Sequence, residues 1–587
     1  MTPRKRSSKR PPPPRLVESK DGDATLISRK IGAMPVIEHF LRRMRLQEFL
    51  DACIGQGRAQ MAGSASLLTL VRNILVGREP IYGIQEWADQ YEPRQLGLSA
   101  GEVDRLNDDR VGRALDSLFD AGYASLVLAV TRHVLKEFDL KLDQLHNDST
   151  TLTFMGAYRG AFRGRTKRGK ETLAIVFGKN KDHRPDLKQL LLVLTVSEDG
   201  GVPVHFTVLD GNTTDDQTHR QTWDFLFGLR GSPDFIYVAD CKLASKDNMQ
   251  YITARGGTFV TVLPRSRAED DAFRARVDRG VLERIQWNEI HRKVEKIAGG
   301  GEKIVDIVSV EAKEVQTAEG YRLFWYLSTL KKSLDSEARA HGIQRALEAF
   351  AELRERLQSP KTRLRERDKV QQEIDKMLAA HEEARFVSFM IWQRLEEKFR
   401  QESPGRPGKN TRYVRQVRKR FELSYEIDEP AVKIAAAHDG IFPLITNHRE
   451  FTAHQVYLTY KKQPIIEKRY AQLKSGLEVA PVWLKEVARI EALACVYYLA
   501  MLAQALIERE LRQGMVREGL EFLLLYPEAR KAKAPCTGRI LALFDNIQKH
   551  VLTEPEGAGH TFRTRLSPAQ KEVLRLLRIP PKLYEKS

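Results

Sequence analysis

The sequence contains few cysteines, and their spacing excludes two classes of protein. Cys53, Cys241, Cys495 and Cys536 are scattered over 587 positions without a CxxC pair. Such spacing indicates neither a disulfide framework nor a zinc site, and it suits a reducing cytoplasm. The basic N-terminus is not followed by an apolar segment, so it does not resemble a secretory signal.

Long apolar runs are also scarce. The most apolar one, Ala492 to Ile507, lies between Glu491 and Glu508 and is short for a bilayer span. We expect it to form a buried core helix, and we expect no membrane partner.

Acidic residues are outnumbered by basic ones. The 78 Asp and Glu against 96 Lys and Arg give a formal charge of +18 and a pI near 9.5. This excess favours a polyanionic partner, although basic composition alone does not separate nucleic acid from a ribosome or a membrane surface.

The N-terminal part divides into a tail and a helical block. The first 23 residues are rich in Arg, Lys, Ser and Pro and are expected to be disordered. From Ile31 to Glu137 apolar residues recur at helical spacing, and Asp108-Asp109 indicates a capped helix start. Several short helices suit recognition of a DNA end by a helix-turn-helix-like unit. A helical dimerisation or packing domain fits the same pattern.

Alternating strands and helices follow this block. An extended run ends in the polar residues 146–151, and apolar runs at 190–196 and 202–209 flank a hairpin signal. A helix at 217–229, a strand at 235–240, a helix at 246–255 and a strand at 258–263 continue the series. The order β, β, β, α, β, α, β is that of an RNase H-like fold. It places Asp148 and Asp240 at or near strand ends, where such a fold exposes side chains to a ligand.

A long insertion separates these strands from a later strand at 439–447. Its first part, Ile285 to Leu330, contains strand-like runs. Its second part, Ser333 to Gln401, is charged, and we expect a helical hairpin interrupted at Ser359-Pro360.

A short polar stretch after the insertion carries a third candidate acid. Pro464 predicts a helix start, and the helix is expected to continue toward Lys485. Glu467 and Lys474 are two turns apart and share a face. Tyr460 precedes Glu467 by seven residues, although Pro464 interrupts a continuous helix between them.

The spacing resembles the Y-(2)-R-(3)-E-(6)-K signature of DDE transposases in the insertion-sequence-four group, closest to the sixteen-thirty-four type. Tyr460, Glu467 and Lys474 match its Y, E and K, and Gln463 replaces its Arg. Five further stretches are similar to segments of this type over most of the chain: Asp148-Ser149-Thr150, the Lys-Asp-His-Arg-Pro-Asp-Leu-Lys-Gln run at 181–189, Val238-Ala239-Asp240, the run Asp439 to Asn447, which resembles the strand that returns to the core, and Arg489-Ile490-Glu491-Ala492.

The resemblance implies a catalytic site. Asp148, Asp240 and Glu467 would be catalytic residues that ligate two Mg²⁺ ions, with Mn²⁺ as a substitute, because hard cations prefer carboxylate oxygens. The predicted DNA contacts are Tyr460, Gln463, Lys474, Arg184 and Lys188. Since Gln463 cannot reproduce the bidentate fork of Arg, Gln463→Arg is expected to leave cleavage intact and to tighten DNA binding.

Three other patterns do not indicate catalytic residues. Gly164 to Lys170 fits G-x-x-x-x-G-K, but Glu171 stands where a hydroxyl must meet Mg²⁺, so an NTPase is rejected. Its cations are expected to form a flexible basic loop facing DNA phosphates. Asp215-Asp216 is expected to cap the following helix, and Asp210-Gly211-Asn212 is expected to form a turn.

The sequence thus predicts an α/β protein: an RNase H-like catalytic core with a long β-plus-helical insertion, preceded by an all-α N-terminal domain. The resemblance implies a transposase that cuts element ends and joins the 3′-hydroxyl to target DNA. Its partners would be terminal inverted repeats and target DNA, as a homodimer in the synaptic complex on a bacterial nucleoid. A non-catalytic DNA-binding or scaffold protein, and a nuclease of the same fold without strand transfer, remain open. The expected segments are a tail (1–23), a helical domain (24–138), a first core part (139–270), the insertion (271–430), a second core part (431–515) and a helical C-terminal segment (516–587).

Overall fold

The computed structural model describes residues 25–55, 60–182, 184–281, 285–296, 301–476, 484–526, 528, 530–554 and 559–585. The predicted disordered tail lies outside these residues, as does the stretch 477–483 of the helix expected to continue toward Lys485. The chain divides into two compact units of mixed α/β structure. Unit 1 comprises Met1–Thr258 and Lys461–Ser587, and unit 2 comprises Phe259–Tyr460.

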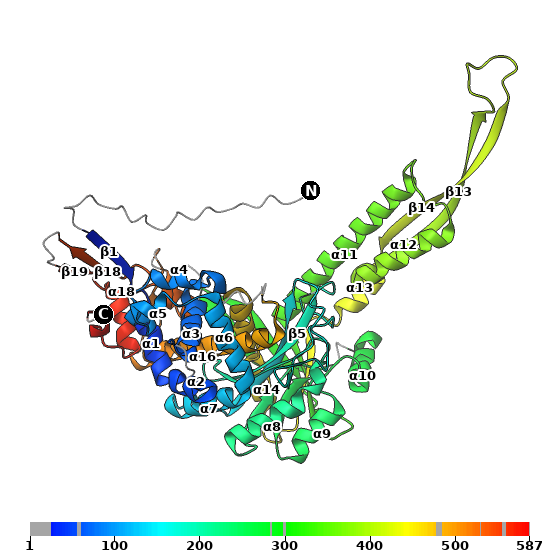
Figure 1. Ribbon diagram of the computed structural model, residues 1–587. Helices are drawn as coiled ribbons and strands as arrows, with labels where there is room; N and C mark the ends of the chain where they lie inside the picture. The colour runs from blue at the N-terminus through cyan, green and yellow to red at the C-terminus, as the bar shows by residue number, and fades with distance from the viewer. Residues whose placement is uncertain are drawn as a thin grey trace. The chain divides into compact units, whose positions relative to one another are not determined.

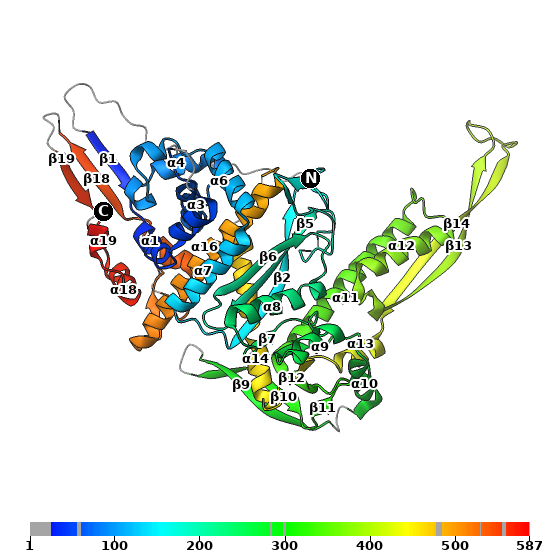
Figure 2. The same ribbon diagram turned by 60° about the horizontal axis from the view of Figure 1, so that its bottom comes forward.

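The sheet of unit 1 has the strand order β6-β5-β2-β7 (Figures 1 and 2). β5 runs antiparallel to both β2 and β6, and β7 runs parallel to β2. The predicted hairpin is confirmed, since Gly200 and Gly201 adopt φ of 78° and 66° between its strands, a conformation that favours glycine. The strands are β2 (Gln144–Phe154), β5 (Lys188–Ser197), β6 (Pro203–Asp210) and β7 (Ile236–Val238).

The N-terminal helices of unit 1 share one hydrophobic core with the long helix α16 (Val487–Arg517). α16 is long and apolar enough to cross a membrane, but 94% of its most apolar window is buried inside the protein, which confirms the predicted core helix. Asn107, rather than Asp108, caps α6 by accepting from the Arg110 N–H. The helices are α1 (Met34–Arg43), α2 (Leu46–Ile54), α3 (Gly63–Arg72), α4 (Ile84–Asp89), α5 (Ala100–Val103), α6 (Asp108–Ala121) and α7 (Tyr123–Glu137).

Smaller elements complete unit 1. They are α8 (His219–Arg230), α9 (Lys246–Ala254), α15 (Pro464–Ala471), α17 (Thr537–Ala542), α18 (Pro568–Leu576), α19 (Lys582–Glu585), a three-stranded sheet of β1 (Thr25–Lys30), β18 (Gln548–Thr553) and β19 (Gly559–Arg563), and the pairs β3 (Thr166–Lys167) with β4 (Lys170–Glu171) and β16 (Leu523–Leu524) with β17 (Lys531–Ala532).

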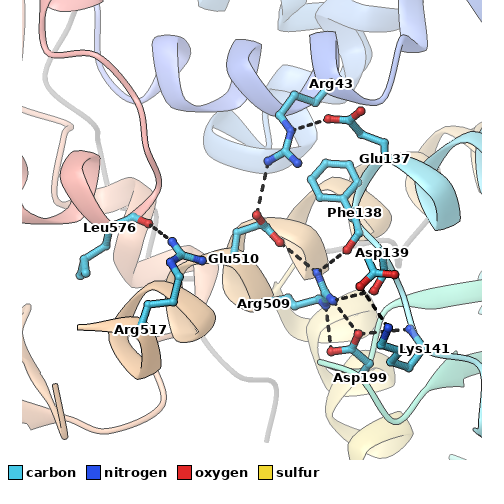
Figure 3. Close-up of polar contacts among 10 residues, drawn as sticks. All are labelled: Arg43, Glu137, Phe138, Asp139, Lys141, Asp199, Arg509, Glu510, Arg517 and Leu576. Carbon is cyan, nitrogen blue, oxygen red and sulfur yellow. Dashed lines mark hydrogen bonds and ion pairs between the residues drawn. The ribbon is translucent and has the colours of Figure 1, made fainter. Parts of the chain in front are cut away.

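A buried arginine ties α16 to the neighbouring elements of unit 1 (Figure 3). The Arg509 guanidinium donates to both carboxylate oxygens of Asp199, at 2.9 and 2.6 Å, and to the carbonyl of Phe138 at 3.0 Å. Asp199 lies in the β5–β6 hairpin, and Phe138 ends α7. Arg509 therefore fixes the sheet and the N-terminal helices to one helix.

Unit 2 contains an antiparallel sheet with the order β8-β15-β12-β10-β9, and β11 pairs with β12. These strands are β8 (Thr258–Val262), β9 (Trp287–Lys296), β10 (Glu302–Glu311), β11 (Val315–Gln316), β12 (Arg322–Ser328) and β15 (Ile441–Thr446), and the shorter helices are α10 (Ala268–Arg276), α13 (Glu429–Ala436) and α14 (Ala453–Lys461).

The second part of the insertion differs from the expected helical hairpin. Helices α11 (Thr329–Gln358) and α12 (Arg367–Ala380) are present, but β13 (Val387–Gln401) and β14 (Tyr413–Ile427) form a long antiparallel ribbon. The prediction of helix up to Gln401 was wrong because Val387, Phe389 and Ile391 alternate with period two. These side chains contribute to a core with α11 and α12.

Candidate functional site

Two of the predicted catalytic acids lie just beyond the paired segment of two neighbouring parallel strands. β2 and β7 pair with His146 opposite Val238. Asp148 and Asp240 each follow their member of this pair by two residues, Asp148 still within β2 and Asp240 past the end of β7. The charge of Asp240 contributes to the raised pKa of Asp148, so the two carboxylates lie near each other.

The environment of these two acids opposes their negative charge. Burial raises the pKa of Asp148 to about 6, and the charge of Asp240 contributes to the rise. Burial also raises the pKa of Asp240, although the Lys242 N–H donates to its Oδ1 at 3.0 Å. The Ser149 N–H likewise donates to Asp148 at 2.7 Å. Carboxylates whose pKa is raised by burial and by neighbouring acids are typical of functional sites.

A lysine and a third aspartate complete the cluster, and sequence reasoning missed both. The Lys181 ammonium lies 3.4 Å from Asp148 Oδ1 and 3.0 Å from Asp215 Oδ2. It also donates to the carbonyl and hydroxyl of Ser149, at 2.7 Å each. Burial lowers the pKa of Lys181, but Asp148 and Asp215 outweigh burial, so the pKa is raised.

The expected capping role of Asp215 was therefore wrong. α8 begins after Thr218 and its first turn receives no side-chain cap. Asp215 instead lies in a short 3-10 turn and forms its ion pair with Lys181. Lys181 is the first residue of the run at 181–189 that resembles the transposase type, so the sequence did mark this lysine. Spacing along the chain cannot show which acid the lysine pairs with.

One face of α15 lies against β2 beside Asp148. The Gln463 amide donates to the carbonyl of Asn147 at 3.0 Å, and its oxygen accepts from His146 Nδ1 at 2.8 Å. One to two turns later, the Tyr470 hydroxyl donates to the main-chain carbonyl of Asp148 at 2.6 Å.

Glu467 lies on the same stripe of the helix. It is four residues after Gln463 and three before Tyr470, so it shares their face. Glu467 is exposed, and it makes no hydrogen bond or ion pair with any residue that the structure describes. The third predicted ligand is thus held near Asp148 by its neighbours, while its own carboxylate is available.

The predicted DNA contacts fall into different environments. Lys474, in the helical turn after α15, pairs with Asp182 at 2.7 Å, directly beside Lys181. Arg184 is exposed and forms a two-bond pair with Asp186. Lys188 donates to the Ala157 carbonyl at 2.6 Å. Tyr460 lies on α14 in unit 2, so its contact with DNA stays a prediction.

Gln463 departs from the expectation. It is 7% exposed, and both ends of its amide are bonded to β2. A side chain held in this way is not available to a phosphate. Its role is to position α15 on the strand that carries Asp148.

The segment that fits G-x-x-x-x-G-K is a β-hairpin of β3 and β4. Arg168 and Gly169 form its turn with φ of 53° and 81°, and no helix follows, which agrees with the rejection of an NTPase. Its cations are held by protein rather than forming a free loop. Arg168 pairs with Asp120 at 2.7 Å, Lys170 donates to the carbonyls of Phe119 and Asp120, and Lys167 pairs with Glu486.

The chemistry of these acids suits a hard divalent cation, but their present spacing does not form a ligand set. Asp148, Asp215 and Asp240 carry carboxylate oxygens, which Mg²⁺ prefers, and the Lys181 ammonium already supplies positive charge to two of them. Within the described part of the chain, no three acidic, histidine or cysteine side chains stand close enough together to hold a metal ion.

Comparison with known proteins bears on the N-terminal helices alone. Residues 26–131 match a family described as "Domain of unknown function (DUF4277)". No curated protein matches the chain. The match spans α1 to α6 and most of α7, and its description assigns no activity to them.

Proposed function

We propose that this protein is a DDE-type DNA transposase that cuts the ends of an insertion sequence and joins the freed 3′-hydroxyl to target DNA. The observation that carries the proposal is the placement of three separate acids. Asp148 on β2 and Asp240 just past the end of the parallel strand β7 each follow the paired residues His146 and Val238 by two positions, and the helix face bearing Glu467 is bonded to the strand that carries Asp148. Three antiparallel strands, a helix and a strand parallel to the first also fit the RNase H-like core expected from sequence.

In this proposal Asp148, Asp240 and Glu467 hold the metal. Two bound Mg²⁺ ions supply the Lewis acidity that activates the attacking oxygen and stabilises the leaving one. With a pKa of about 6, Asp148 is ionised at neutral pH and can serve as a ligand. The exposed side chain of Glu467 is free to turn toward the aspartates, because no group in the described part of the chain holds it.

The remaining residues of the site either position α15 or neutralise charge. Tyr470 and Gln463 fix the register of α15 on β2. Lys181 neutralises Asp148 and Asp215 until a cation takes that place. Lys474 is a phosphate contact, since it can exchange its exposed partner Asp182 for DNA at little cost.

The rival functions differ in what the acids do. A scaffold protein would not need acids at matching strand positions, because their mutual repulsion only weakens the fold. A nuclease of the same fold would use the same acids for cleavage but would not join a 3′-hydroxyl to a second duplex. The family resemblance favours strand transfer.

The test measures cleavage, joining and binding separately. Full-length Asp148→Ala, Asp240→Ala and Glu467→Ala are compared with Asp143→Ala, an exposed acid paired with Arg230 at 3.1 Å. Substrates are duplexes from the DNA that flanks the coding region, either intact or with a precut 3′-hydroxyl end, in 10 mM Mg²⁺.

We expect the three variants to lose cleavage and joining by at least about a thousandfold while DNA-end binding is retained, because each removes a metal ligand. Asp143→Ala should behave as the wild type. Strong residual cleavage by Asp240→Ala removes that residue from the site, and cleavage without joining of precut ends identifies a nuclease.

A further inference from the structure

The β13–β14 ribbon is packed against helices over only half of its length. At its base, Phe350 and Leu353 of α11 and Ile374 of α12 form a core with Val387 and Leu423. From Arg394 on one strand and Arg420 on the other, none of the ribbon residues is buried. Figures 1 and 2 show the ribbon extending beyond the ends of α11 and α12. We call residues 394–420 the distal arm.

The distal arm concentrates positive charge. It carries ten Lys and Arg against three Glu, a net charge of +7 within 27 residues, whereas the whole chain has +18. Four of its cations pair with Glu396, Glu397 or Glu422. The other six have no ion pair within the described chain: Arg400, Arg406, Lys409, Arg412, Arg418 and Lys419.

The register of the ribbon sorts these side chains onto two faces. One face presents Arg394, Lys398, Arg400, Arg418 and Arg420, with Glu396 as the single carboxylate. The opposite face continues the apolar stripe of the base, but no helix covers it. It presents Leu395, Phe399, Tyr413 and Val417, each 51% to 65% exposed, interleaved with Glu397, Arg415 and Lys419.

The tip joins these strands through a turn rich in proline and glycine. Arg406 stands between Pro404-Gly405 and Pro407-Gly408. The Gly408 N–H donates to the Thr411 hydroxyl at 2.7 Å, and the Thr411 N–H donates to the Gly408 carbonyl at 3.0 Å. An arginine between prolines at the end of a rigid ribbon is suited to a DNA groove, where arginine seeks negative potential and proline can wedge between base steps.

We infer that the distal arm is a second DNA-binding element, separate from the acidic site and located in unit 2. The basic face lies along the phosphates of a duplex, and the tip enters a groove. Seven residue steps from Arg394 to Gln401 span about 24 Å, and a two-stranded ribbon fits the major groove, which is about 12 Å wide. The choice of DNA as the polyanion rests on the proposed function; the need for a polyanion rests on the arm itself.

The other occupant that the exposed apolar face suggests is the arm of a second copy. Two arms of +7 would repel each other, and only exposed, screened glutamates are present to offset that repulsion. Exposed cations also protect a free ribbon edge from pairing with another chain. Charge therefore favours DNA over self-association.

The experiment compares two full-length variants with equal charge changes. The arm variant is Arg400→Gln, Arg406→Gln, Lys409→Gln and Arg412→Gln. The control variant is Lys361→Gln, Arg363→Gln, Arg365→Gln and Arg367→Gln, four exposed cations in the same unit, three between α11 and α12 and one at the first residue of α12. Binding to a 30-base-pair duplex of arbitrary sequence is measured by fluorescence anisotropy across a salt series in EDTA. Thermal unfolding and molar mass in solution are recorded for each protein.

We expect the arm variant to bind at least about tenfold more weakly at low salt and to reduce the slope of log K against log salt by about 3 to 4, since each phosphate contact contributes about 0.9. The control variant should change the salt slope by less than the contribution of one phosphate contact, about 0.9, with a correspondingly small change in affinity. Equal losses in the two variants, or no loss in either, overturn the inference. A change from dimer to monomer with unaltered DNA binding assigns the arm to a second copy. Because this assay measures binding and needs no cleavage, its result can be interpreted even if the catalytic proposal fails.

Discussion

Replacing Lys181 with methionine tests whether the acidic cluster is built around a cation. The ammonium lies 3.4 Å from Asp148 and 3.0 Å from Asp215. At an effective dielectric constant of about 20, each attraction amounts to about 5 kcal/mol before the cost of desolvating the charges. Removing one partner of a buried pair costs about 3 to 5 kcal/mol. Since a third of the Lys181 side chain is exposed, we expect a net loss of about 2 kcal/mol for Lys181→Met.

The same variant should respond more strongly to Mg²⁺. A site with a dissociation constant of about 1 mM gains about 1.4 kcal/mol of stability in 10 mM Mg²⁺, and a site tenfold tighter gains about 2.7 kcal/mol. Lys181 competes with the metal for Asp148, so its removal should move the protein from the first case toward the second.

The assay is urea unfolding of wild type, Lys181→Met, Asp215→Asn and the double variant, each in EDTA and in 10 mM Mg²⁺. In EDTA, Lys181→Met should cost less in the Asp215→Asn background, because one of its two carboxylate partners is gone. Equal stability of Lys181→Met and wild type in EDTA, together with equal Mg²⁺ responses, would refute the reasoning. The readout is stability, so it does not depend on transposition.

Three further predictions concern other parts of unit 1. Burial raises the pKa of Glu491 from the ordinary 4.5 to about 7, so ionisation of this side chain weakens the fold as pH rises from about 4.5 to 7. In urea unfolding, Glu491→Gln should therefore be more stable than wild type by about 2 to 3 kcal/mol at pH 8 and equally stable at pH 4.5. An equal gain in stability at both pH values contradicts this prediction. Gln463→Arg should lower stability by at least about 2 kcal/mol and reduce cleavage, because the larger charged side chain must displace α15 from β2. A variant that is stable and active would instead support the phosphate contact expected from the sequence. A fragment ending at Phe138 should fail to unfold cooperatively, because its helices lose the core that they share with α16, and a cooperative transition by circular dichroism would show an independent domain.

The sequence predicted local structure well where one pattern decided it. The hairpin of β5 and β6, the helices α8 and α9, and the buried α16 follow from runs of residues close together in the chain. The ribbon β13–β14 was missed because charged residues dominate its outer half, where Gln393 and Glu397 interrupt the apolar alternation of the base. Two positions were misjudged for a different reason. Gln463 and Asp215 take their roles from His146 and Lys181, which are 317 and 34 positions away, and no local pattern shows such contacts.

The contrast between two groups of buried charge in unit 1 supports the proposal that the acidic cluster is a functional site. Glu508 is fully buried, yet Arg469 at 2.9 Å and the Thr537 N–H at 2.9 Å satisfy it, and although burial alone would raise its pKa, these partners lower it below the ordinary value. Such a pair holds α15 to α16. Asp148 and Asp240 have the opposite balance, because burial and a neighbouring aspartate, Asp240 for Asp148 and Asp215 for Asp240, outweigh Lys181 and raise both pKa values. For stability alone, separating these acids or adding a second cation from the chain would be better. Their incomplete neutralisation is therefore the feature that favours the proposed metal site, in which a bound cation would supply the missing positive charge.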